Sequence, residues 1–153
     1  MTTSSMLEEA GYIHYEVSNF ALAESLASRH NRKYWDHTPY LGLGPAAHSF
    51  ADGKRRWNKS SVSEYCDALG AGRSPAAGEE TLTAEDLAFE ALFLGLRTRK
   101  GIPESLLDDG TGTPPSKKAL LERLLDEGYL ERQDGFLRPT RKGMAVADGL
   151  ALL

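Results

Sequence analysis

The sequence predicts an α+β fold, in which the terminal strands and loops of a larger α/β sheet precede a winged-helix-like helical domain. Three features lead to this prediction: an early strand signal, a run of small residues near the middle, and a closing series of helices around one hairpin. We expect a first segment at residues 1–69, a linker at 70–80 and a second domain at 81–153.

The first segment has one clear strand signal. Residues 6–10 form the end of a helix, Gly11 is a turn residue, and residues 12–17 have the aromatic and β-branched composition of a strand. Residues 40–43 are a weaker strand candidate, and the stretch between the two is expected to be a loop. One or two strands cannot make a complete barrel. The segment is therefore expected to be the closing part of a larger sheet.

Small residues then mark a boundary. Residues 61–69 are compatible with a short helix, and the sequence GAGRSPAAG at 70–78 is typical of a linker. Thr83 begins a well-marked helix, because Thr83 and Asp86 form a capping pattern and basic residues gather before Gly101. Its buried face is expected to consist of Leu87, Ala91, Leu92, Leu94 and Leu96.

The closing elements have the order of a winged helix. Short helices are predicted at residues 103–107 and 117–127, the latter with Leu120, Leu121, Leu124 and Leu125 facing inward. A hairpin follows at 129–132 and 136–138, because Asp134 and Gly135 are a strong turn signal. Thr140 is expected to cap a last helix over 141–150.

Composition excludes several classes of site and partner. Cys66 is the only cysteine, so this chain alone builds no disulfide, cysteine zinc site or iron–sulfur cluster, and we expect a reducing cytoplasm. No segment approaches the ~18 to 20 apolar residues of a transmembrane helix. The net charge is −4, and residues 61–114 hold four Lys and Arg against ten Asp and Glu. We therefore expect no nucleic-acid partner.

A winged helix nevertheless raises DNA binding as an alternative function, since such domains place a helix in the major groove. The candidate recognition helix offers Lys117, Lys118 and Arg123 as cations. Glu122, Asp126 and Glu127 offset them, which favours a role in protein packing.

The hexapeptide HNRKYW at residues 30–35 is the strongest site candidate. His30 is a possible ligand of iron or zinc, and Tyr34 and Trp35 offer surfaces for a flat apolar ring. A closed zinc site is disfavoured, because no second ligand stands at zinc-like spacing. A metal already held in a macrocycle is more compatible with a single histidine. His14 is expected to be a structural residue within a strand, and His37 to lie in a loop.

Two further stretches carry weaker signals. In GLGPAAHSF, residues 42–50, the small residues allow close approach of the backbone to a ligand such as adenine or ribose. The stretch from Arg55 to Asn58 is compatible with binding a ligand carboxylate, and equally with a solvated loop.

Together these stretches resemble one family. YEVSNFA at 15–21, HNxxYW at 30–35, GxGPxAHSF at 42–50 and RxN at 56–58 are similar to motifs of the oxygen-independent coproporphyrinogen III oxidase-like radical SAM family, in particular its heme chaperone (HemW-like) branch. The series from Glu90 to Ile102 and the stretch LxPTxxG at 137–143 resemble its C-terminal domain. The resemblance covers residues 6–153 in the order found in the family.

The resemblance implies a fold and cofactors. Family members combine a partial, TIM-like α/β barrel with S-adenosyl-L-methionine and a 4Fe-4S cluster on a CxxxCxxC loop. This loop is absent here, so the chain looks like the C-terminal part of such a protein and is expected to lack radical chemistry alone. Its expected partners are heme or porphyrin, the N-terminal radical SAM half and heme-acceptor proteins.

The resemblance also assigns candidate residues. HNxxYW implies heme binding, with His30 as the axial iron ligand and Asn31, Tyr34 and Trp35 shaping the pocket. Gly44, Ala47 and His48 are expected near S-adenosylmethionine. The implied function is a heme chaperone, with an oxidase that decarboxylates coproporphyrinogen as the alternative.

The chain departs from the family pattern in two places. Leu22, Ala23 and Glu24 stand where many relatives have a Pro-Gly turn. Ala46 replaces a usual glycine. The first departure falls in the segment that leads to His30 and is expected to alter it.

Overall fold

The computed structural model describes residues 3–107 and 115–150, and the chain forms two compact units. Unit 1 comprises Met1–Ser28 and Ala88–Leu153, and unit 2 comprises Arg29–Leu87. This division differs from the expected boundaries after residues 69 and 80. The cause is β5 (Ala76–Thr81), which starts inside the expected linker and pairs with a strand of unit 2 that precedes it.

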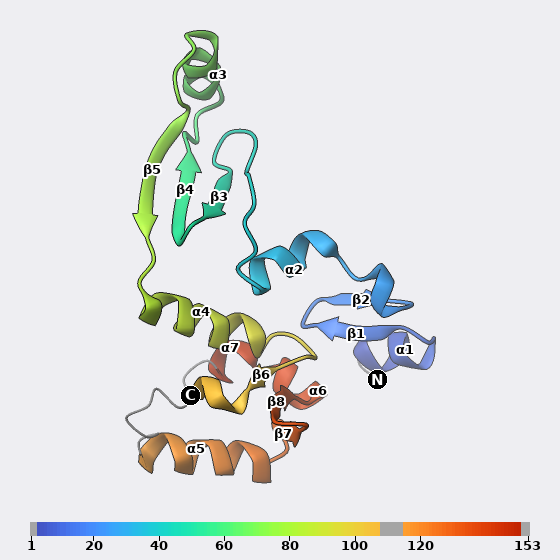
Figure 1. Cartoon of the computed structure of the whole chain (residues 1–153). Coiled ribbons are helices and arrows are strands. Elements are labelled where there is room, and N and C mark those ends of the chain that lie inside the picture. Colours follow the sequence, from blue (N-terminus) through green and yellow to red (C-terminus); the bar gives the residue numbers. More distant parts are fainter. Residues whose placement is uncertain (1–2, 108–114, 151–153) are drawn as a thin grey trace. The chain divides into compact units, whose positions relative to one another are not determined.

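Unit 1 begins with a helix followed by a small hairpin (Figure 1). Helix α1 (Thr3–Glu9) leads into β1 (Ile13–Glu16), which pairs antiparallel with β2 (Asn19–Ala21). A 3-10 turn, η1 (Glu24–Leu26), follows. The predicted helix end and first strand are confirmed. All strand pairs among the described residues are antiparallel. The described residues therefore contain no parallel strand pair of the kind that forms an α/β barrel.

A buried carboxylate joins this hairpin to the end of α4 (Ala84–Gly95). Glu16 is 5% exposed and accepts hydrogen bonds from the Ser18 amide at 3.0 Å and from Asn19 Nδ2 at 2.5 Å. Arg97 Nη2 lies 3.6 Å from the same carboxylate. Ser18, Asn19 and Arg97 thus provide the hydrogen-bonding and charged partners that the buried Glu16 carboxylate requires.

The predicted capping of α4 is confirmed. The Thr83 amide donates to Asp86 Oδ2 at 2.8 Å, and the Asp86 amide donates to Thr83 Oγ1 at 3.1 Å. This reciprocal arrangement is a capping box. The Thr83 hydroxyl also donates to the Asp86 carboxylate, and these bonds lower the pKa of Asp86 because they favour its charged form.

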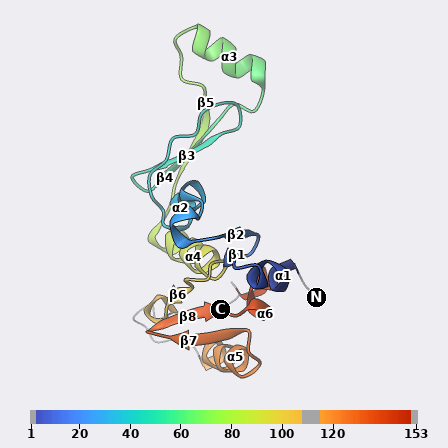
Figure 2. The same ribbon diagram turned by 90° about the vertical axis from the view of Figure 1, so that its right-hand side faces the viewer.

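The C-terminal elements of unit 1 form the winged-helix-like arrangement that the sequence predicts (Figure 2). The 3-10 helix η2 (Glu104–Leu107) and α5 (Pro115–Asp126) precede the hairpin of β7 (Leu130–Gln133) and β8 (Phe136–Pro139). Strand β6 (Ile102–Pro103) completes a sheet of order β6-β8-β7. The α+β fold class is confirmed.

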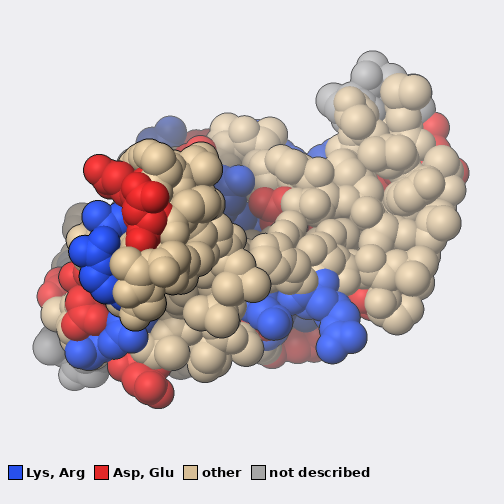
Figure 3. All heavy atoms as spheres, turned by 90° about the horizontal axis from the view of Figure 1, so that it is seen from above, with Lys and Arg blue, Asp and Glu red and all other residues tan. Residues whose placement is uncertain are grey.

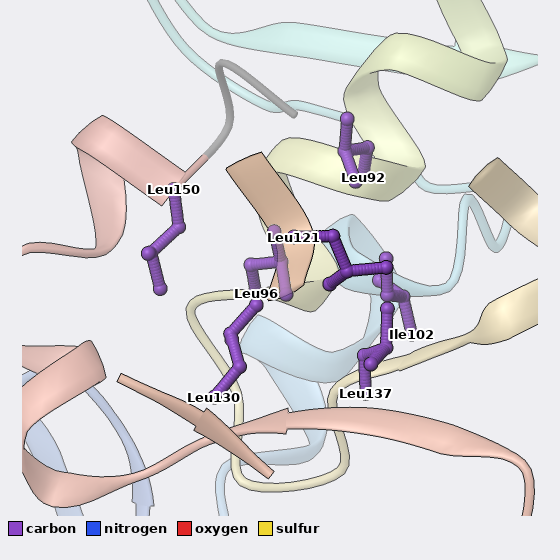
Figure 4. Packing of buried hydrophobic residues seen from close by; sticks show 7 residues of the cluster. All are labelled: Leu92, Leu96, Ile102, Leu121, Leu130, Leu137 and Leu150. Carbon is purple, nitrogen blue, oxygen red and sulfur yellow. The ribbon is translucent and has the colours of Figure 1, made fainter. Parts of the chain in front are cut away.

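One hydrophobic cluster holds these elements together (Figure 4). Leu96 and Leu137 are 0% exposed, and Leu121 is the most buried of the leucines predicted to face inward from α5. The half-buried Leu120, Leu124 and Leu125 pack against the cluster. Its buried members are Leu92, Leu96, Ile102, Leu121, Leu130, Leu137 and Leu150.

The expected single last helix is wrong in one respect. Thr140 caps it as predicted, since Thr140 Oγ1 accepts from the Gly143 amide at 3.1 Å. The helix is divided into α6 (Arg141–Met144) and α7 (Ala147–Leu150). Gly143 lies within the first piece and Gly149 within the second, and glycine weakens a continuous helix.

Unit 2 contains α2 (Arg29–Trp35), a three-stranded antiparallel sheet and α3 (Val62–Gly70). Strands β3 (His48–Ala51) and β4 (Lys54–Asn58) form a hairpin, and β5 is the third strand of the order β3-β4-β5. In Figures 1 and 2, α3 follows the end of β4 and leads back to β5.

The sequence predicted this sheet poorly. The expected strand at residues 40–43 is wrong, because only Tyr40 makes a bridge, to Phe50. The true strands lie in the turn-rich and charged stretches that follow it. The predicted helix at 61–69 is confirmed by α3, which Ser61 caps by accepting from the Glu64 amide.

In the described parts of the chain, no helix combines the length and apolar character that crossing a bilayer requires. On the face in Figure 3, Lys and Arg side chains lie beside Asp and Glu at several places rather than forming one large basic area.

Candidate functional site

The HNRKYW segment is helical, which corrects the expectation of a loop. All six residues belong to α2. In a helix, residues four apart lie on one face, so His30 pairs with Tyr34 and Asn31 pairs with Trp35. This spacing was the signal in the sequence that indicated a helix. The density of polar and aromatic residues and the nearby Pro39 obscured it.

His30 and Tyr34 form the exposed part of the site. Tyr34 Oη and His30 Nε2 are 3.2 Å apart, at hydrogen-bond distance. Their ring centroids are 5.1 Å apart in an edge-to-face arrangement. Both residues are exposed, and Nδ1 of His30 has no hydrogen-bond partner among the described residues. Nδ1 of the imidazole is therefore available to an incoming ligand, and the Tyr34 ring lies beside it.

Two aromatic residues that the sequence did not single out extend this support. The Tyr34 ring contacts the Tyr40 ring at 4.5 Å between centroids, and Tyr40 contacts Phe50 at 6.3 Å. Two backbone hydrogen bonds of 2.9 Å between Tyr40 and Phe50 hold the second pair together. The ring centroid of His37 also lies 5.8 Å from that of Phe50. The tertiary structure thus joins α2 to strand β3 by rings distant in sequence.

Asn31 and Trp35 lie one turn apart on a more buried side of α2. Both are half-buried and both have interactions with other residues. The structure therefore separates the four predicted heme residues into an exposed pair, His30 and Tyr34, and a half-buried pair, Asn31 and Trp35.

The GLGPAAHSF stretch is shaped by close backbone packing. A Cβ on Gly42 would lie 2.0 Å from the carbonyl oxygen of His48, so only glycine fits there. Asn58 Nδ2 donates to the carbonyls of Gly44 at 2.9 Å and Gly42 at 3.4 Å. The Gly44 amide donates to Tyr65 Oη at 3.1 Å. The backbone of Gly44 is thus already engaged by side chains of unit 2.

The other residues expected near S-adenosylmethionine lie on the same sheet. The carbonyl of Ala47 accepts from the Asn58 amide at 3.0 Å. His48 is exposed, and its ring centroid is 6.1 Å from that of Trp57. A Cβ on Gly78 would lie 2.5 Å from the Trp57 ring, so Gly78 lets the indole lie against β5. The structure thus brings Ala47, His48 and Gly44 together through Asn58 and Trp57. Their proximity to S-adenosylmethionine stays a prediction.

Strand β4 places positive side chains on both faces of its sheet. Arg56 is opposite Glu79 and Arg55 is opposite Glu80, and successive residues of a strand face opposite sides. Arg56 Nε donates to Glu79 at 2.8 Å and Lys54 Nζ donates to it at 3.3 Å. The hydrogen bond from Arg56, followed by that from Lys54, holds the pKa of Glu79 below its usual value.

The cations of the winged-helix-like part are paired with acids. Arg123 on α5 donates to Glu127 at 2.7 Å, and Arg132 on β7 donates to Glu122 at 2.9 Å and Glu104 at 3.2 Å. These pairs lower the pKa of Glu127 and raise that of Arg132. They reduce the positive potential that a phosphate backbone would need.

No group of three or more His, Cys, Asp or Glu able to hold a metal ion occurs among the described residues. A metal at His30 would accordingly have one protein ligand from this part of the chain. Such a donor set fits a metal whose other positions are filled by a macrocycle, as in heme.

Comparison with known proteins identifies the family. The profile described as HemN C-terminal domain matches residues 82–146. The heme chaperone HemW of Mycobacterium tuberculosis is 34% identical over 144 residues, covering 94% of this chain and 35% of the relative. The heme chaperone HemW of Bacillus subtilis is 30% identical over 146 residues, covering 94% of this chain and 38% of the relative.

The chain belongs to the HemN and HemW family of radical SAM proteins. Its profile match is to the C-terminal domain of HemN, and the chain spans just over a third of the length of the HemW relatives. A bovine member, "Radical S-adenosyl methionine domain-containing protein 1, mitochondrial", is 34% identical over 97% of this chain and 36% of that protein.

The fold agrees with this family. A solved structure of coproporphyrinogen III oxidase (HemN) from Escherichia coli, a radical SAM enzyme, superposes with a TM-score of 0.69. It covers 98% of this chain and 38% of that protein at 16% identity. This likeness shows that the HemN/HemW chain has the corresponding part of the HemN fold.

Proposed function

We propose that this HemN/HemW chain binds heme through His30 and that the complete protein delivers the heme to an acceptor protein. The observation that carries the proposal is the exposed imidazole of His30, one helical turn from Tyr34 and continuous with Tyr40. The relatives named heme chaperones support it. A cytoplasmic location is part of the proposal, because the single cysteine implies no disulfide.

The residues divide the task. His30 would donate a nitrogen lone pair to the iron, and the faces of Tyr34 and Tyr40 would cover part of the ring. Asn31 and Trp35, which are half-buried, would support α2 from its less exposed side. Bound heme would supply an iron with an open coordination position for the imidazole. Because His30 and Tyr34 are exposed, the ligand can be given up to another protein without opening a core.

The oxidase remains the second function within the family. The solved neighbour is such an enzyme, but its likeness at 16% identity concerns the fold alone. Turnover of coproporphyrinogen by the reconstituted complete protein would favour it. Catalysis would need the cluster loop, which this chain lacks.

The test is a heme titration of the 153-residue chain and its His30→Ala variant, followed at the Soret band. We expect a shifted Soret band for the wild type, and for the variant about tenfold weaker binding or more, because an axial ligand is lost. His37→Asn is the matched control, since it removes a neighbouring imidazole and asparagine tolerates the positive φ of 48° there. An unchanged spectrum and affinity in His30→Ala would refute the ligand assignment.

A further inference from the structure

The sheet face of unit 2 that carries Lys54 and Arg56 contains a groove of about 430 Å³. Tyr40, Leu41 and Phe50 form its apolar wall, and Ser49, Lys54 and Arg56 form its polar side. Asp52, at the β3–β4 turn, is its acidic lining residue. The groove thus combines a flat apolar surface with two cationic side chains, as a planar anionic ligand would require.

The groove shares a wall with the proposed heme ligand. Tyr40 lines the groove and contacts the Tyr34 ring, which contacts the His30 ring. These two contacts, of 4.5 and 5.1 Å between centroids, lie within unit 2. A flat ligand held at His30 would therefore have a continuous aromatic path toward the groove.

The two cations have donors to spare. Lys54 and Arg56 share one carboxylate, that of Glu79. Both side chains remain exposed, Lys54 by 43% and Arg56 by 60%. Arg56 uses Nε for this bond, and its two terminal nitrogens bind nothing further in the part of the chain that is described. A guanidinium has five N–H donors and an ammonium has three, so further carboxylates can be bound.

We propose that this groove receives the carboxylate edge of the tetrapyrrole, with the propionates on Lys54 and Arg56 and the ring along Tyr40 and Tyr34 toward His30. The inference rests on the proposed function and specifies it, since it names the groups that orient the ring. Leu41 is 77% exposed and would lose exposed apolar surface on binding. The carboxylate of S-adenosylmethionine offers the same chemistry, so the test must separate the two sources.

Strand β4 supplies a matched control. Arg55 lies between Lys54 and Arg56, faces the other side of the sheet and pairs with Glu80 at 3.2 Å. Arg55→Gln removes one positive charge from the same strand without altering the groove. Lys54→Gln and Arg56→Gln both change exposed side chains, so the fold is expected to be retained.

The experiment titrates the full chain with heme, heme dimethyl ester and iron-free protoporphyrin, and compares the wild type, Lys54→Gln/Arg56→Gln and Arg55→Gln. We expect the double variant to bind heme and protoporphyrin about tenfold more weakly. The affinity of the double variant for the dimethyl ester should equal that of the wild type, because the ester has no free carboxylates whose contacts could be lost. Arg55→Gln should change each affinity by less than about twofold.

The outcomes separate this inference from the heme proposal. Equal losses for heme and its dimethyl ester, or equal losses in Arg55→Gln, would overturn the groove assignment while leaving His30 as ligand. Displacement of protoporphyrin by S-adenosylmethionine would overturn it in favour of that cofactor. If His30→Ala binds heme normally but the carboxylate dependence persists, the ligand assignment fails and the groove stands. If no tetrapyrrole binds, both fail.

Discussion

Unit 1 and unit 2 bury different amounts of apolar surface. The hydrophobic cluster of unit 1 contains seven buried side chains, with Leu96 and Leu137 completely enclosed. Among the described residues of unit 2, Phe50 and Ala68 are the buried hydrophobics, and Leu43 is 80% exposed. Unit 2 relies instead on strand pairing and on side chains such as Asn58 that bind loop carbonyls.

This difference shows how the chain divides stability and binding. A packed core resists rearrangement, so unit 1 is suited to a supporting role. Exposed aromatic and cationic groups suit reversible binding, and the groove of unit 2 brings aromatic and cationic side chains together. Both tryptophans, Trp35 and Trp57, lie in unit 2, so tryptophan fluorescence reports on that unit alone.

The largest expected effect is on unit 1. Leu96→Ala should lower the free energy of unfolding of unit 1 by about 2–5 kcal/mol, because it removes a fully buried leucine and leaves a cavity. Urea unfolding followed by hydrogen exchange at Leu92, Leu130 and Leu137 measures this loss. Leu69→Ala, at a half-exposed position in α3, is the control and should cost little.

This variant also tests the comparison itself. If the units unfold independently, tryptophan fluorescence of Leu96→Ala should retain the wild-type midpoint. Equal shifts of the fluorescence and exchange midpoints would show one cooperative unit and break the comparison.

The next effect concerns the side chain that binds the loop of unit 2. Asn58→Ala should destabilise unit 2 by about 1–2 kcal/mol, because the carbonyls of Gly42 and Gly44 lose their donor. Tryptophan fluorescence during urea unfolding reads this out, since Trp57 is adjacent. Asn58→Asp keeps the shape but not the donor and should be equally harmful. An unchanged midpoint in both variants would mean that other bonds hold the loop.

The smallest effect is a gain. Ala46 has φ of 57°, in the left-handed region that favours glycine. Ala46→Gly should stabilise unit 2 by about 0.5 kcal/mol, because relief of the strained backbone exceeds the greater entropy of glycine in the unfolded chain. Ala47→Gly, at a residue without positive φ, should instead destabilise it slightly. A loss of stability in Ala46→Gly would contradict the strain argument.

Elements with a local signal were predictable. The capping box at Thr83, the turn at Asp134 and Gly135, and the inward leucines of α5 depend on neighbours within a few residues, and the structure confirms them. Helix α2 was missed although its spacing was visible, because a short polar helix lacks an apolar stripe. Strands β4 and β5 were missed because charged or small residues fill them.

By itself, the sequence determined the family, the winged-helix-like order of elements and His30 as the leading ligand candidate, since these depend on residue types and short spacings. Only the tertiary structure decided that His30 is exposed beside Tyr34, that Tyr40 continues the aromatic surface, and that Lys54 and Arg56 share Glu79. The His30–Tyr34 pair lies within one helix, whereas the contacts of Tyr40 and of Glu79 join residues from separate elements. Their formation depends on strand register and ring packing, which no local stretch of sequence encodes.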